Sequence, residues 1–162
     1  MRKLLLLIFF LHSFSFSKSL IGLEFGSTRA DFFNLNKAQD IERVKKEVSG
    51  LNSYSYIGSY HGKPAKFYVY FKEDRFFKAE ALINVEQIAK TVSMGISVQE
   101  LYRMEFMAIY YYLIKELGYP RGISRIDPVR YGAEWQNTNS IWQVSLSGDK
   151  NLPELRVINQ LK

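Results

Sequence analysis

The sequence predicts an α+β domain in which helices pack on an antiparallel sheet. The hydrophobic spacing alternates between three or four residues, which is typical of helices, and two residues, which is typical of half-buried strands. Hydrophobic residues make up 47% of the 162 residues and charged residues 23%, as expected of a globular domain rather than a disordered chain. The chain has no cysteine, which excludes a disulfide framework, a thiolate zinc site and a cysteine nucleophile.

The N-terminus has the three parts of a secretory signal peptide. Residues 1–3 (Met-Arg-Lys) form a short basic stretch, and residues 4–11 form an unbroken apolar run. Ser15 and Ser17 fit the small residues before a cleavage site, which predicts cleavage after Ser17, with cleavage after Ser19 as the alternative. We therefore predict a signal peptide of residues 1–17, one mature domain, and a periplasmic or secreted location. No apolar run reaches the roughly 18 residues that cross a bilayer as a helix, so we expect no transmembrane anchor after cleavage.

The mature domain, residues 18–162, begins with helical patterns. Thr28 follows Gly26 and Ser27, and its hydroxyl predicts the cap of a helix that runs to Phe33. The apolar residues between Ile41 and Val48 are spaced by three and four, which predicts an amphipathic helix. From residue 54 the period becomes two, and three antiparallel strands are expected over residues 54–60, 66–72 and 75–83.

The second part of the chain repeats this order. A short helix is expected over residues 84–94, and Ser97 opens a long helix that ends at Leu117. That helix is apolar almost all round, so we expect it to be the central buried element. Residues 118–128 are interpreted as a long connection. Three further strands are expected over residues 131–136, 141–146 and 152–159.

The order helix, three strands, helix, three strands suggests a tandem repeat with sub-repeats 20–83 and 84–162. Phe67, Val69 and Phe71 in the first part correspond in pattern to Trp142, Val144 and Leu146 in the second. Residue identity between the two parts is small, so this is a repeat of pattern. Whether the two sets of strands join into one sheet is left open by the sequence.

The segment Gly26-Ser27-Thr28-Arg29-Ala30-Asp31, together with this helix-then-strands order, resembles small exported bacterial domains of the β-lactamase-inhibitor-protein and SmpA/OmlA outer-membrane-assembly type. The resemblance covers nearly all of the mature chain and implies a binder or scaffold rather than a catalyst. The chain departs from that group in having no cysteine to brace each half and no lipoprotein cysteine. No binding residue is carried over from the resemblance.

Catalytic motifs are absent from the sequence. The one histidine of the mature chain, His61, lies in a predicted turn, and there is no nucleophile elbow, calcium loop, Walker loop or dinucleotide fingerprint. The acidic pairs Glu73–Asp74 and Glu100–Glu105 are interpreted as solvated charge. We therefore expect no catalytic residue, no metal and no cofactor, although an envelope hydrolase that uses acidic residues is kept as a third hypothesis.

An arginine cluster provides the second hypothesis. Arg121, Arg125 and Arg130 fall in or next to the predicted connection, with only Asp127 against them. Three guanidinium groups on one loop bind a phosphate or another small anion through paired hydrogen bonds, and the alternative is a solvated surface loop. Nucleic acid is not expected as a partner, because the protein is exported and its positive charge is modest.

An aromatic sheet face provides the first hypothesis. Alternation places Phe67, Val69 and Phe71 on one side of their strand and Tyr68 and Tyr70 on the other. We expect Tyr56 of the preceding strand to join these two tyrosines. Rigid aromatic side chains of this kind favour a protein partner, here an inhibitor target, a toxin or an assembly factor of the cell envelope. The alternative is a core with two apolar sides.

Overall fold

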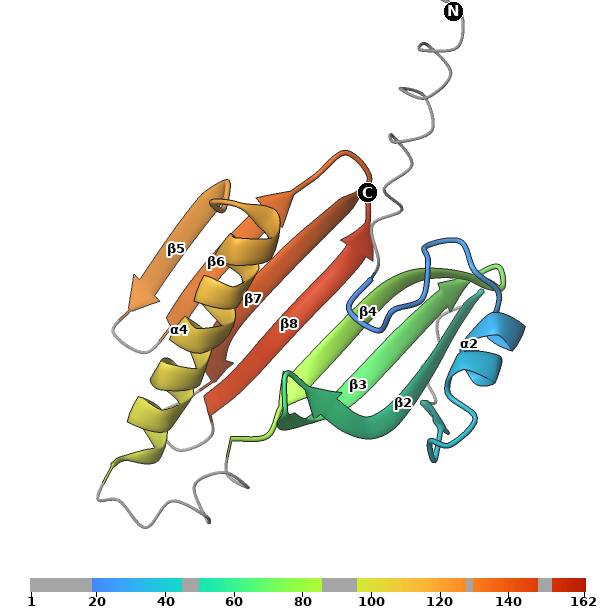
Figure 1. Cartoon of the computed structure of the whole chain (residues 1–162), viewed down its shortest axis with the longest axis horizontal. Helices are drawn as coiled ribbons and strands as arrows, with labels where there is room; N and C mark the ends of the chain where they lie inside the picture. The colour runs from blue at the N-terminus through green and yellow to red at the C-terminus, as the bar shows by residue number, and fades with distance from the viewer. Residues whose placement is uncertain (1–18, 45–49, 86–95, 128–129, 149–152) are drawn as a thin grey trace, which may run out of the picture.

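Two helices and eight antiparallel strands make up this computed structural model, which describes residues 19–44, 50–85, 96–127, 130–148 and 153–162 (Figure 1). The strands form one sheet in the order β1-β2-β3-β4-β8-β7-β6-β5. Since β4 and β8 pair at the middle of the sheet, the strands of both halves of the chain join into a single sheet. The fold is therefore mixed α and β with a large sheet, as the hydrophobic pattern predicts.

The first half contains α2 (Arg29–Leu35), β1 (Glu42–Val44), β2 (Leu51–Tyr60), β3 (Lys63–Lys72) and β4 (Arg75–Ile83). The predicted cap of α2 is confirmed: Thr28 Oγ1 accepts a hydrogen bond from the Asp31 amide at 3.2 Å, and the Asp31 carboxylate accepts one from the Thr28 amide at 2.8 Å. These two bonds satisfy backbone donors that the first turn of a helix leaves open.

The predicted helix over residues 41–48 is wrong where the structure describes it. Residues 42–44 form β1, which pairs with β2, and Ser53 Oγ donates a hydrogen bond to the Val44 carbonyl at 3.2 Å. A helical spacing of apolar residues is a local signal, and here the hydrogen-bonding edge of β2 overrides it.

The second half contains α4 (Val98–Leu117), β5 (Gly122–Asp127), β6 (Arg130–Gln136), β7 (Ser140–Gly148) and β8 (Pro153–Leu161). Ser97 caps α4 by accepting a hydrogen bond from the Glu100 amide at 3.2 Å, as predicted. The predicted connection over residues 118–128 is wrong, because it contains β5, an edge strand held by its pairing with β6. In each half the helix is followed by four strands, not three.

Two predictions concern residues that are not described. The signal peptide of residues 1–17 lies outside the described residues, and so do residues 86–94 of the helix expected over 84–94.

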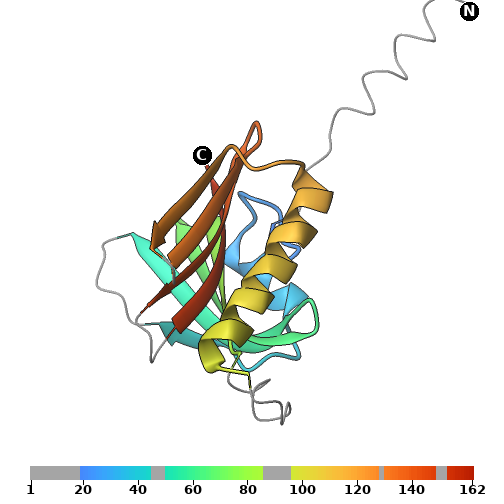
Figure 2. The same cartoon turned by 90° about the vertical axis from the view of Figure 1, so that its left-hand side faces the viewer.

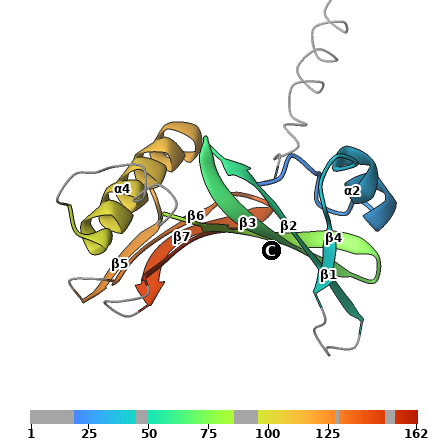
Figure 3. The same cartoon turned by 90° about the horizontal axis from the view of Figure 1, so that it is seen from below.

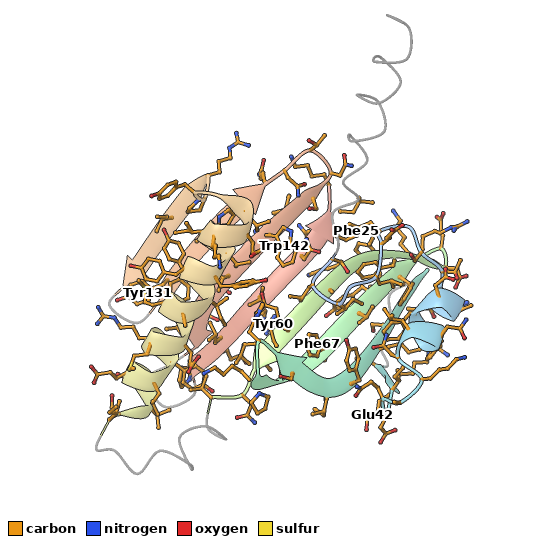
Figure 4. All side chains as sticks on the ribbon, in the orientation of Figure 1. Phe25, Glu42, Tyr60, Phe67, Tyr131 and Trp142 are labelled. Atoms are coloured by element: carbon orange, nitrogen blue, oxygen red, sulfur yellow. The ribbon has the colours of Figure 1, made fainter. Side chains whose placement is uncertain are left out.

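Both helices lie on the same side of the sheet, and alternate residues of each strand build the core beneath them (Figures 2 and 4). On β3 the buried residues are Phe67, Val69 and Phe71, and on β7 they include Trp142 and Val144. A single buried cluster extends from these strands to Phe32 of α2 and to Leu101, Phe106, Ile109 and Leu113 of α4.

The expectation that the long helix is the central buried element is wrong. Helix α4 contacts β7 and β8 with one side only, and its other side faces solvent, where Met104 is 55% and Tyr111 62% exposed. A helix on one face of a sheet has an outer side, and amphipathic tyrosines are tolerated there.

The sheet curves away from the side that carries the helices, so that the backbone of the strands is concave on the opposite side (Figure 3). We call this opposite side the open face, because neither described helix covers it. Antiparallel sheets commonly have one face on the core and one in water, and the polar second face is their usual feature.

Candidate functional site

The strand register arranges the side chains of the open face in rows across the sheet. Partner residues on neighbouring strands share a face, so each row can be followed from strand to strand. The central row, in order from β2 to β6, consists of Ser55, Tyr68, Glu80, Ile158, Gln143 and Glu134. Residues from both halves of the chain therefore share this face.

Tyr68 and Tyr70 lie on the open face, as alternation predicts. Both side chains are half-buried. The Lys66 ammonium lies 5.6 Å from the centre of the Tyr68 ring, and the Lys78 ammonium lies 5.2 Å from the centre of the Tyr70 ring. These cation–π contacts hold the rings in place while leaving part of each ring in solvent.

Glu80 anchors the charged groups around the two tyrosines. It is 7% exposed, and its carboxylate forms ion pairs with Lys78 Nζ at 2.6 Å and with Arg156 Nη1 at 3.4 Å. Arg156 also pairs with Glu154 at 3.0 Å. Burial, and secondarily the charge and hydrogen bond of Glu80, raise the pKa of Tyr70 to about 12. The network thus fixes the ring and the hydroxyl of Tyr70 and joins β3, β4 and β8.

Three aliphatic residues extend the aromatic pair toward the second half of the sheet. Leu82, Ile158 and Ile141 come from β4, β8 and β7, and each is half-buried on the open face. Neighbouring members of this series are diagonal neighbours in the register, within reach of one another's side chains. We call Tyr68, Tyr70, Leu82, Ile141 and Ile158 the apolar centre.

Sequence reasoning missed the aliphatic part of this centre. The alternation of β7 and β8 carries the signal, since Ile141 and Ile158 are apolar residues opposite in phase to Val144 and Val157. What the sequence does not contain is the pairing of β4 with β8, which brings the residues of the two halves side by side.

Tyr56 does not join Tyr68 and Tyr70, and that expectation is wrong. It is 8% exposed on the helix-covered face, where its ring stacks on Phe67 with centroids 5.0 Å apart and lies 6.2 Å from Phe32. Burial raises its pKa to about 12. The register pairs Tyr56 with Phe67, and paired residues share a face, so Tyr56 belongs to the core.

The three arginines do not lie on one loop. Arg121 precedes β5 and donates a hydrogen bond from Nη1 to Gln136 Oε1 at 2.5 Å. Arg125 is inside β5, and Arg130 is the first residue of β6. Four residues of strand separate Arg121 from Arg125 by about 13 Å. An anion site built from all three therefore remains a prediction that nothing in this arrangement favours.

The other candidate groups have structural partners. His61 lies in the exposed β2–β3 turn with its ring centre 3.8 Å from that of Tyr112, and burial lowers its pKa. Glu105, predicted to be solvated, pairs with Lys63 at 2.7 Å. In the described part of the chain, no group of three or more histidine, cysteine, aspartate and glutamate side chains is arranged to hold a metal ion.

Comparison of the chain with protein-family models, with curated proteins and with solved structures finds no match. The resemblance to β-lactamase-inhibitor and SmpA/OmlA domains therefore stays a prediction. Within the residues that the structure describes, neither helix combines the length and the hydrophobicity that crossing a bilayer requires.

Proposed function

We propose that this protein is an exported, non-enzymatic binding protein that holds a protein partner of the cell envelope on the open face of its sheet. An inhibitor, an immunity protein or an assembly accessory would each work in this way. The proposal of export depends on the signal-peptide pattern of residues 1–17, and the proposal of binding depends on the open face.

The observation that supports binding is the apolar centre, which is crossed by the ion pairs of Glu80 and bordered by charged and amide side chains. Protein interfaces commonly have an apolar core enriched in aromatic residues and a polar rim. Here the rim includes Lys66, Arg156, Gln143 and Glu134, which surround the apolar centre on β3, β8, β7 and β6. A polar second face is the usual state of an antiparallel sheet, so five half-buried apolar residues gathered there favour a partner.

The size of the open face suits a protein better than a small ligand. The seven strands other than the three-residue β1 span about 29 Å, and six or seven residues along each of them span about 20 Å. Their product, about 600 Å², is of the same order as the roughly 800 Å² that each partner contributes to a standard protein interface. Small molecules prefer enclosed pockets that bury most of the ligand, whereas the apolar centre lies on a curved sheet surface.

The experiment is affinity capture from the envelope of the source cell, with the full chain expressed there and tagged after Lys162. Tyr68→Ser/Tyr70→Ser should lower the yield of a stoichiometric partner at least tenfold, because it removes the two aromatic contacts. The matched control is Tyr111→Ser/Tyr119→Ser, which removes two tyrosines that are 62% and 88% exposed elsewhere. The control should leave the yield within twofold of the wild type.

Two further measurements accompany the capture. Circular dichroism and a thermal melt establish that both double variants fold. Determination of the N-terminal residue of the recovered protein tests cleavage after Ser17. Equal capture by the wild type and by folded Tyr68→Ser/Tyr70→Ser would show that the open face is not the binding site, and recovery of the uncleaved chain would contradict the predicted signal peptide.

A further inference from the structure

A hollow of about 460 Å³ lies on the open face, at the end of the sheet away from the tyrosines. It is lined by Gly122 and Ile123 of β5, by Gly132, Ala133 and Glu134 of β6, and by Gln143, Val144 and Ser145 of β7. Ala133 and Val144 are buried on the helix-covered side of the sheet, and Ile123 pairs with Ala133, so the side chains on the open face of the hollow are small or polar. Two glycines and a serine on three neighbouring strands leave the peptide backbone as the floor. A Cβ built on Gly122 would meet no atom within 4 Å, so the space above that residue is open.

Among the described residues that line the hollow, Glu134 is the one that carries a charge. Gln143 Nε2 donates to one carboxylate oxygen of Glu134 at 2.8 Å, and Gln136 Nε2 donates to the other at 2.8 Å. These hydrogen bonds, that of Gln143 first, hold the pKa of Glu134 below its ordinary value. The carboxylate is therefore ionised and oriented at neutral pH.

The polar groups of the described residues that face the hollow are mainly hydrogen-bond acceptors. Each oxygen of Glu134 receives one amide N–H and keeps a further lone pair, and the amide group of Gln143 presents its own oxygen. Ser145 adds a hydroxyl that accepts as well as donates. Arg121 is outside the lining and donates its hydrogen bond to Gln136, and its charge helps to lower the pKa of Glu134 without a direct bond to that carboxylate. Arg156 is occupied by Glu80 and Glu154.

The acceptor sites that remain suit a ligand that carries several donors and a positive charge. A guanidinium group has five N–H donors in a plane and no acceptor, and it pairs with a carboxylate through two parallel hydrogen bonds. A hard metal ion is a poor fit, because it needs several oxygen ligands with more negative charge than one carboxylate supplies. The volume also exceeds that of a bare ion and accommodates a long side chain.

We propose that the hollow beside Glu134 receives an arginine side chain of the protein partner. This inference rests on the proposed function, because it places the arginine on a partner that covers the same face. Glu134 and Tyr68 belong to one cross-strand row and are separated by four strand spacings, or about 19 Å. The partner should therefore present an arginine about that far from the surface that covers Tyr68.

The test uses a probe of defined chemistry, acetyl-arginine amide, titrated into the full chain and followed by NMR. We expect saturable shifts of the Gln143 and Gln136 side-chain amide signals, and weaker binding of acetyl-lysine amide. Glu134→Gln should lower the affinity for the arginine probe at least tenfold, and Gly122→Val, which fills the hollow from β5, at least threefold. Glu42→Gln is the matched control, since it removes one exposed carboxylate of the same row at the far edge. It should change the affinity less than twofold.

Several outcomes would overturn the inference. One is unchanged probe affinity in folded Glu134→Gln, and another is an equal loss in Glu42→Gln, which would indicate general attraction to negative charge. Free arginine that binds far more tightly than its capped form would indicate a small-molecule site instead. Captured partner that is lost with Tyr68→Ser/Tyr70→Ser but retained with Glu134→Gln would refute the inference and leave the proposed function standing. Because the titration needs no partner, failure of the proposed function would not alter its result.

Discussion

The two faces of β3 have the same aromatic character but different surroundings. On the helix-covered face, Val69 and Phe71 are 0% exposed and lie among other apolar side chains. On the open face, Tyr68 and Tyr70 are half-buried, and lysines and an ion network hold them. The residues of the helix-covered face therefore stabilise the fold. The tyrosines of the open face are positioned by polar contacts and keep exposed area for a partner.

The largest effect is expected from the helix-covered face. Phe71→Ala leaves a cavity beneath α2, where the Phe71 ring lies 5.7 Å from Phe32 and 5.9 Å from Phe76. The free energy of unfolding should fall by about 3–5 kcal/mol, because both apolar transfer and packing are lost. Denaturant unfolding followed by circular dichroism measures this. The control is Lys72→Ala, the next residue along the strand, which is exposed and should change stability by about 0.5 kcal/mol or less. Similar losses in the two variants would remove the distinction between the faces.

An intermediate effect on stability is expected when Glu80, a buried charged residue of the open face, is replaced. Glu80→Ala leaves Lys78 and Arg156 without the carboxylate that they share, and it removes the hydrogen-bond partner of Tyr70. Because both cations keep access to solvent, the loss in unfolding free energy should be about 1–3 kcal/mol. The same variant should weaken partner capture, since Tyr70 is no longer held. Glu154→Ala is the control, because that carboxylate is 49% exposed and pairs only at the rim. A loss in Glu154→Ala as large as in Glu80→Ala would contradict an anchoring role for Glu80.

The last effect, which is absent at neutral pH, is a dependence on alkaline pH that both faces share. The pKa of Tyr56 and of Tyr70 is raised from near 10 to about 12, so the folded state holds these protons more tightly than the unfolded state. Their contribution to stability is complete below about pH 10 and is lost as the pH rises toward about 12. Unfolding experiments across this range should show a decline that is shallower in Tyr56→Phe and in Tyr70→Phe. Titration of tyrosinate absorbance supplies an independent readout, and an ordinary titration of both residues would contradict the expectation.

Several elements were predictable because their signals are local. The cap at Thr28 and the helix that starts after Ser97 depend on side chains that bond to nearby backbone. The strand over residues 75–83 is found as β4 with the same limits. The opposite orientation of Phe67 and Tyr68 follows from the two-residue period of a strand, whatever that strand pairs with.

Other elements depended on partners distant in the sequence. Strand β5 has no clear alternation and exists through its pairing with β6, and β1 forms where a helical spacing would otherwise predict a helix. Alternation along β2 shows which of its residues share a face with Tyr56, but not on which side of the sheet they lie. The register with β3 pairs Tyr56 with Phe67 and therefore puts it on the opposite side of the sheet from Tyr68. The two-residue period of a strand shows which of its side chains share a face. It does not show which side chains of the neighbouring strand lie on that same face.

The class of the fold, the positions of the capped helices and the alternation along β3 can be predicted from the order of the residues, since each produces a pattern within a short stretch of chain. The pairing of β4 with β8 is visible only in the folded chain, and with it the apolar centre that Ile141 and Ile158 complete and the row that links Tyr68 to Glu134. The physical reason is that backbone hydrogen bonds between strands are the same for every residue type, so the choice of neighbouring strand depends on how the whole core packs.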